Sequence, residues 1–451
     1  MAAALPRFNR EELEALVLRA YTHAQLREHL RDLRQRPRTV SGDSPFGALG
    51  PELTVEVLRH ADTATRLVAV TAVCRAWRDL RHHPRLWETV AFDLAAPRRL
   101  AAFFEIAAGL VKSLTLRGGD ATRVEELFSA SPLLSPRRLV VTSLAAANAL
   151  SSLQFGGLRE LSVSALSAPA LAALGAAAPA LERLRIDALV NLPHSGAFAP
   201  LPRLSHFSVV VLDGRGDSAR ALVAALMLAA RALRDLRLCA ARAVREAWSP
   251  RPDLTEALAA APASLERLRL ARLRARVDAL ARSHAKVVDL TDVGDAAVQV
   301  AAAAAHAEDV TIRELSLYDG GATRGERPAP LPLHLFGAAG RLRRLRLEFR
   351  DVTAAGLAHL AASLAAAAAA GATRGVVELA LKTAPAHWPC LGQPPPEEGA
   401  AAAFRDAAQW CSLRSLSFSG FSEEFLAALL AGAALPDGCR LRLASARRAA
   451  A

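Results

Sequence analysis

Arginine side chains recur at two fixed positions of a short repeated pattern, Leu-x-x-Leu-x-Leu. They occupy its third or fifth position in four copies, as Arg183, Arg185, Arg237, Arg267, Arg269, Arg344 and Arg346. A guanidinium group can bind a carboxylate or a phosphate through two parallel hydrogen bonds. These seven arginines are therefore candidates for binding an acidic or phosphorylated segment of another protein.

The arginine excess also has a compositional explanation. The net charge is +12, yet only three of the 56 basic residues are lysines, namely Lys112, Lys286 and Lys382. Arginine is thus the default basic residue of this chain and could simply fill exposed positions. Nucleic acid would use the same arginines. We rank nucleic acid lower as a partner, because Tyr318 and Phe418 are nearly alone as strand aromatics that could stack on bases.

The sequence contains no motif that is typical of a catalytic site. There is no phosphate-binding glycine loop and no Gly-x-Ser-x-Gly segment. The five cysteines show no metal-ligand spacing, and the adjacent His82 and His83 would point in different directions along a helix. We therefore expect no catalytic residue, no metal and no other cofactor. The cysteines are interpreted as reduced thiols, which places the protein in the cytoplasm or nucleus.

The leucine pattern itself extends from residue 111 to near the end of the chain. Clear copies begin at residues 111, 158, 181, 204, 233, 265, 312, 342, 376 and 413, and weaker ones at 136, 285 and 438. Spacings of 23, 23 and 29 residues after the copy at 158 are typical of leucine-rich repeats, in which each unit is a strand plus a helix. Because side chains alternate along a strand, the leucines should face the core and the arginines the opposite, concave face.

The predicted fold class is therefore α/β. A repeat cannot bury its leucines alone and must stack on its neighbours, so residues 93–451 should form a curved solenoid of about 12 irregular repeats, with parallel strands inside and helices outside. The uncharged run 352–373 is long enough to cross a bilayer. Its leucines fall on one helical face, however, so we predict a repeat helix and no membrane contact.

Three shorter segments precede the repeats. Residues 1–36 have helical periodicity and are predicted to form a helical extension, part of which faintly resembles the first half of a SAP-type DNA-binding motif without its second helix. Residues 37–45 read as a linker rich in Pro, Ser and Gly. Residues 46–92 then form a unit of three short helices, too small to bury much apolar area alone, so we expect it to need a partner surface.

The segment 46–92 resembles an F-box, and the whole chain resembles F-box proteins with leucine-rich repeats. The resemblance rests on "LGPEL" at 49–53, "EVL" at 56–58, "RLVAVTAVCRAWRDL" at 66–80 and "PRLW" at 84–87. It departs from the family pattern at Gly50, which separates Leu49 from Pro51, and at Ala61, where a leucine is common.

In that family the F-box binds the Skp-type adaptor of a cullin-RING ubiquitin ligase, and the repeats hold the substrate. The resemblance implies an adaptor contact through Leu49, Pro51, Glu52, Leu53, Val57, Leu58, Leu67, Val73, Cys74 and Trp77. Among these, Pro51, Glu52 and Leu53 are expected in direct contact, whereas Trp77 and Trp87 are expected mainly to pack internally. The implied function is a non-catalytic substrate receptor of an SCF-type ligase. The alternative is a repeat scaffold, or a nucleic-acid-binding protein that uses its arginine-rich face.

Overall fold

The computed structural model describes residues 51–72, 75–94, 103, 107–190, 199–212, 216–240, 254, 258, 260–273, 285–291, 307–317, 341–352, 354–383, 404, 410–421 and 423–444. The predicted extension 1–36 and linker 37–45 lie outside these residues, as do Leu49, Val73 and Cys74. The chain divides into two compact units, the first containing residues up to 165 and 176–181, and the second containing 166–175 and the residues from 182 onward.

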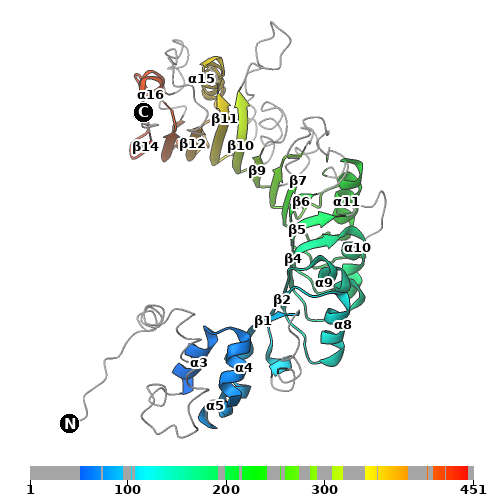
Figure 1. Cartoon of the computed structure of the whole chain (residues 1–451). Coiled ribbons are helices and arrows are strands. Elements are labelled where there is room, and N and C mark those ends of the chain that lie inside the picture. The colour runs from blue at the N-terminus through cyan, green and yellow to red at the C-terminus, as the bar shows by residue number, and fades with distance from the viewer. Residues whose placement is uncertain are drawn as a thin grey trace, which may run out of the picture. The chain divides into compact units, whose positions relative to one another are not determined.

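The first unit begins with short helices and continues into strands. In chain order its elements are α3 (Pro51–Arg59), α4 (Thr63–Ala72), α5 (Arg75–Asp79), η1 (Leu80–His82), α6 (Pro84–Trp87), β1 (Thr89–Asp93), η3 (Ala108–Leu110), β2 (Ser113–Arg117), α8 (Ala121–Ala130), β3 (Arg138–Val141), α9 (Leu144–Ala149), η4 (Leu150–Ser152) and most of β4 (Glu160–Ser167). Helices α8 and α9 contact each other and lie on one side of the strands (Figure 1).

The second unit consists of strands with fewer described helices. Its elements are most of α10 (Ala168–Ala177), β5 (Arg183–Val190), β6 (His206–Leu212), α11 (Gly216–Ala229), β7 (Asp235–Ala240), β8 (Arg267–Ala271), β9 (Val287–Thr291), β10 (Asp309–Leu317), β11 (Arg344–Val352), α15 (Ala354–Ala369), β12 (Glu378–Thr383), β13 (Ser415–Ser419), α16 (Glu423–Leu429) and β14 (Arg440–Ala444).

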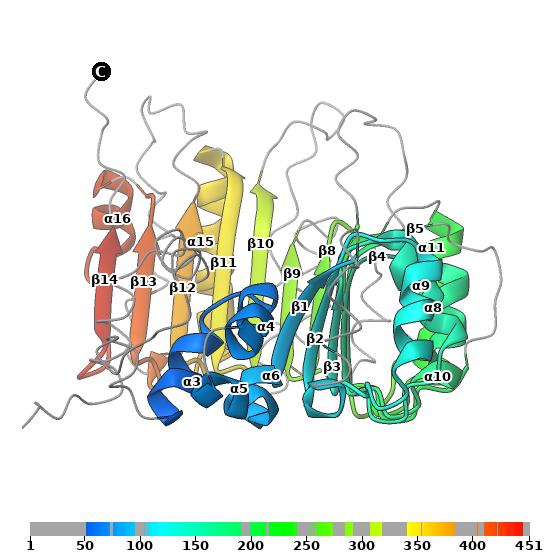
Figure 2. The same cartoon turned by 60° about the horizontal axis from the view of Figure 1, so that its bottom comes forward.

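The strands form an open, parallel sheet of 14 strands whose spatial order follows the chain order. Figure 2 shows the last of them, β11 to β14, side by side in sequence. The weak copies of the leucine pattern at 136, 285 and 438 are confirmed as strands β3, β9 and β14. The parallel α/β prediction is therefore confirmed, while the assignment of this sheet as a leucine-rich-repeat solenoid stays a prediction.

Buried side chains align in rows across the second unit. One row is formed by residues paired strand to strand: Leu184, Phe207, Leu236, Leu268, Val288, Val310, Leu345, Leu379, Leu416 and Leu441. All except Leu441 are buried. Each strand thus covers the apolar side chains of its neighbour, which accounts for the spacing of the leucine pattern.

Two strands differ from the sequence prediction. The copy expected at 312 begins five residues earlier, because Asp309 pairs with Val287 on β9 and Arg344 on β11, and Val310 and Ile312 are the buried pair. Strand β1 begins inside the segment 46–92 that was predicted as helical and ends one residue beyond it, and it pairs with β2 from Thr89 to Asp93. The parallel sheet therefore begins within that segment.

Candidate functional site

The first helix among the described residues, α3, carries an exposed apolar patch. Helix α3 begins at Pro51, where a proline's missing N–H and fixed φ suit the first helical turn. Leu53 is 40% exposed, an unusual exposure for a leucine, and Val57 lies one helical turn beyond it and is half-buried. Pro51 and Glu52 are also exposed. We call Pro51, Glu52, Leu53 and Val57 the α3 patch.

The acidic residue of the α3 patch is oriented by the end of the helical segment. One Glu52 carboxylate oxygen lies 3.5 Å from Nη1 of Arg85 and the other 4.0 Å from Nε2 of His83. Both basic residues precede or begin α6, which contacts α3. The Glu52 side chain is 73% exposed, so the pairing leaves it accessible beside Leu53.

Three residues included in the expected adaptor contact are buried within the domain, and Trp77 among them was expected mainly to pack internally. Leu58 is 1% exposed, and Leu67 and Trp77 are each 6% exposed. They belong to the buried core of the segment, together with Val55, Val70 and Leu86. Trp87 is fully buried and its indole N–H donates to the carbonyl of Arg81, so its predicted internal packing is confirmed.

A buried arginine joins these helices to the first strand, and the sequence analysis did not identify it. Arg66 of α4 is 7% exposed and donates to the carbonyls of Leu86 and Thr89, the latter at 3.0 Å. Thr63 Oγ1, at the start of α4, accepts the backbone N–H of Ala91 at 2.8 Å. Burial lowers the pKa of Arg66 to about 10. Helix α4 and strand β1 are thus held together by polar contacts.

The helical segment and strand β1 together match a known family. An F-box-like family model matches residues 47–93, which end with the last residue of β1. Residues 47–93 form an F-box-like domain. Among curated proteins, none matches the chain significantly. The F-box-like domain therefore contains both the α3 patch and the Arg66 contacts.

The arginines predicted at the second candidate site do lie on the face of the sheet opposite the buried leucines. Six of them, Arg183, Arg185, Arg237, Arg267, Arg344 and Arg346, are exposed, and Arg269 is half-buried. In register they form two rows across the second unit. The first row contains Arg183, His206, Asp235, Arg267, Val287, Asp309, Arg344 and Glu378, and the second contains Arg185, Ser208, Arg237, Arg269, Asp289, Thr311, Arg346 and Ala380.

The first row contains carboxylates as well as arginines, a feature that the sequence analysis missed. Arg267 Nη1 lies 4.0 Å from Asp235, and Arg344 lies 3.6 Å from both Asp309 and Glu378. Arg346 of the second row donates to Glu378 at 2.8 Å, which raises the pKa of Arg346. Aligning the third and fifth positions of the copies would have revealed these acids, because Asp235 and Glu378 occupy the same positions as the arginines.

One acidic residue of the second row is unusual. Asp289 on β9 is 19% exposed, and its Oδ2 lies 3.4 Å from Arg313 Nη2 on β10. Its Oδ1 is buried and accepts no hydrogen bond. Burial raises the pKa of Asp289, and the nearby Arg313, Arg269 and Arg237 oppose that rise.

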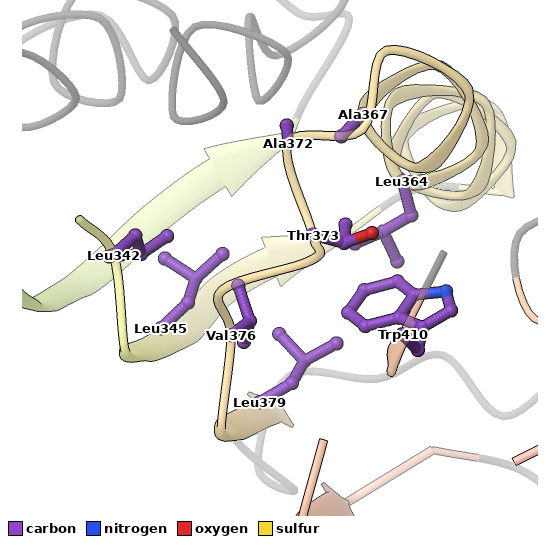
Figure 3. Close-up of a pocket in the computed structure, with 9 residues that line it drawn as sticks. All are labelled: Leu342, Leu345, Leu364, Ala367, Ala372, Thr373, Val376, Leu379 and Trp410. Atoms are coloured by element: carbon purple, nitrogen blue, oxygen red, sulfur yellow. The ribbon is translucent and has the colours of Figure 1, made fainter. Parts of the chain in front are cut away.

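A small interior gap lies on the other, leucine-lined face. Figure 3 shows Leu364 of α15, Thr373 and Trp410 turned towards it, opposite Leu345 and Leu379 of two neighbouring strands. Its volume of about 10 Å³ is close to the space of one water molecule. This gap is too small for a ligand and is a packing feature of the core.

Metal-binding clusters and membrane-spanning helices were both sought among the residues that the structure describes. Within them, no group of three or more His, Cys, Asp or Glu side chains is placed to hold a metal ion. No helix in these parts of the chain is both long and apolar enough to cross a membrane. Helix α15, which covers most of the uncharged run, buries Leu360 and Leu364 in the protein core instead.

Proposed function

We propose that this chain is the substrate-recognition subunit of an SCF-type cullin-RING ubiquitin ligase. The F-box-like domain binds a Skp-type adaptor, and the strand-rich part, as a leucine-rich-repeat solenoid, binds a target protein for ubiquitination. The chain is not itself an enzyme, and ligase activity belongs to the partner complex. The observation that carries the proposal is the F-box-like match at residues 47–93.

The exposed α3 patch supports adaptor binding through a small number of residues. Leu53 and Val57 present apolar surface one turn apart, next to the accessible carboxylate of Glu52. An amphipathic helix of this kind binds by placing its apolar side chains in a partner groove. Leu58, Leu67 and Trp77 then contribute by shaping the domain core beneath the patch.

The charge pattern of the strand face supports a protein target rather than nucleic acid. A polyanion is bound by a surface that neutralises many phosphates at once. Here Asp235, Asp309 and Glu378 share the first row with the arginines and pair with two of them. A surface of mixed charges instead suits a protein segment that carries both acidic and basic groups.

Adaptor binding is tested with the full-length chain and a purified Skp-type adaptor. We expect the adaptor to be captured by the natural chain and lost with Pro51→Ala/Leu53→Asp, because a carboxylate in an apolar groove is costly to desolvate. The matched control is Leu228→Asp, since Leu228 is an exposed helix leucine (68%) on α11, far along the sequence from the F-box-like domain. Capture that survives the double change, or no capture by the natural chain, would overturn the proposal.

A further inference from the structure

Arg237 and Arg269 place two like charges next to each other on the strand face. They are direct partners in register on the neighbouring strands β7 and β8. At every other described position of the two rows in the second unit, an arginine faces a carboxylate, a histidine or an uncharged residue on each adjacent paired strand. Like charges directly opposite each other destabilise a sheet.

The carboxylate of Asp289 beside this pair interacts electrostatically with both guanidinium groups, which oppose the rise of its pKa, but it forms its ion pair with Arg313. Among described contacts, Arg267 pairs with Asp235, and Asp289 is engaged at 3.4 Å by Arg313. Neither Arg237 nor Arg269 lies within ion-pair distance of a described carboxylate, whereas Arg185, Arg267, Arg344 and Arg346 each do. Two guanidinium groups are thus available side by side on neighbouring strands.

We propose that Arg237 and Arg269 form a binding subsite for a single phosphate or carboxylate group of the target protein. The proposal rests on the proposed function and narrows its seven candidate arginines to two. Adjacent strands are about 4.8 Å apart, so one tetrahedral or planar anion can accept hydrogen bonds from both guanidinium groups. Binding removes the repulsion between the two charges, because the anion lies between them.

The residues on either side of the pair limit the subsite to one anion. Ser208 precedes Arg237 on β6 and can donate a hydroxyl hydrogen bond to the same group. Asp289 follows Arg269 on β9, and its carboxylate repels a second anion at that end. The surface thus favours one phosphorylated or acidic side chain, with uncharged or basic residues of the target lying towards β9.

The test uses the full-length chain bound to its adaptor and three immobilised peptide libraries. Each library has seven residues, with phosphoserine, serine or aspartate fixed at the centre and degenerate residues around it. We expect retention on the phosphoserine library to exceed that on the serine library by about tenfold. A single hydrogen bond to a charged group is enough to change the affinity by that factor. Retention on the aspartate library equal to that on phosphoserine would assign the subsite to carboxylates, and weaker retention would assign it to phosphate.

Substitutions of the arginines show which of them bind the anion. Arg237→Gln/Arg269→Gln should abolish the preference for the charged libraries, and Arg237→Lys/Arg269→Lys should retain part of it, because lysine keeps the charge but loses the paired hydrogen bonds. Arg344→Gln/Arg346→Gln is the matched control and should keep the preference, since both guanidinium groups are already paired with carboxylates. Equal retention on all three libraries, or a preference lost only in the control, would overturn the subsite. Adaptor capture, measured on the same samples, reports separately on the proposed function.

Discussion

Arg237 and Arg269 face each other across β7 and β8, and the cost of that arrangement can be measured without any ligand. Replacing Arg237 with glutamine removes one of two like charges in direct register. The free energy of unfolding should therefore stay unchanged or rise by up to about 0.5 kcal/mol, within the range known for cross-strand pairs. Arg344→Gln removes exposed ion pairs to Asp309 and Glu378 and should lower it by about 0.2–1 kcal/mol. Urea unfolding compares the two, and a clear loss of stability in Arg237→Gln would mean that this arginine has a structural role.

Asp289 gives a pH dependence of opposite sign to that of an ordinary surface carboxylate. Burial raises its pKa in the folded chain above its value in the unfolded chain. The folded state therefore binds the proton more tightly, so stability rises as pH falls from the folded pKa towards the unfolded value. Asp289→Asn lacks this titration. We expect the natural chain to gain stability relative to Asp289→Asn between pH 7 and pH 4, measured by urea unfolding, and a relative loss would contradict the burial of this carboxylate.

At the residue scale, the sequence predicted where the arginines lie better than it predicted which residues they pair with. Strand alternation predicted correctly that the seven arginines lie opposite the leucines. The carboxylates that pair with Arg267 and Arg344 were missed because they lie on other strands, more than thirty residues away in the chain. Likewise, helical periodicity alone could not tell that Leu58 faces inward while Leu53 faces outward, since that depends on how the short helices pack.

At the scale of elements, the contacts between α4 and β1 make the F-box-like domain continuous with the sheet. Arg66→Met would leave the buried carbonyl of Leu86 and the part-buried carbonyl of Thr89 without their donor. We expect a loss of about 1–3 kcal/mol in unfolding free energy. Arg59→Met is the matched control, because Arg59 pairs only with Glu56 among its described ion pairs and is exposed, and it should change stability by less than about 0.5 kcal/mol.

Amide hydrogen exchange locates the Arg66 effect. If Arg66 joins the two elements, Arg66→Met should speed exchange in both β1 and α4, and Thr63→Val should do the same by leaving the N–H of Ala91 unpaired. Faster exchange confined to α4 would show that β1 is held by its pairing with β2 alone.

Element boundaries show where sequence reasoning fails and why. Leu-x-x-Leu-x-Leu can be read in two frames around Ile312, with Ile312 as its first or its last apolar position. Only the pairing with β9 and β11 selects the second frame, in which Val310 and Ile312 are buried. Strand β1 was missed because the F-box resemblance covered most of its residues. Those residues were therefore assigned to the helical segment.

At the scale of the whole molecule, each strand depends on the next one to cover its apolar side chains. Leu416 on β13 and Leu441 on β14 are direct partners in the same row, yet Leu416 is fully buried and Leu441 is 43% exposed. Leu443 is likewise 51% exposed, whereas its partner Phe418 is fully buried. In a stacked array, stability is a sum of contacts between neighbouring units, so identical residues should differ in importance according to whether a neighbour covers them.

This dependence predicts unequal effects of one substitution at paired positions. Leu416→Thr should cost about 2–4 kcal/mol of unfolding free energy, because it removes apolar volume and leaves a hydroxyl in the core. Leu441→Thr should cost less than about 1 kcal/mol, since much of that side chain already meets solvent. Thermal or urea unfolding of the two variants measures the contrast. Equal costs would mean that another surface covers β14 in solution, and the stability of this strand would then come from outside the described sheet.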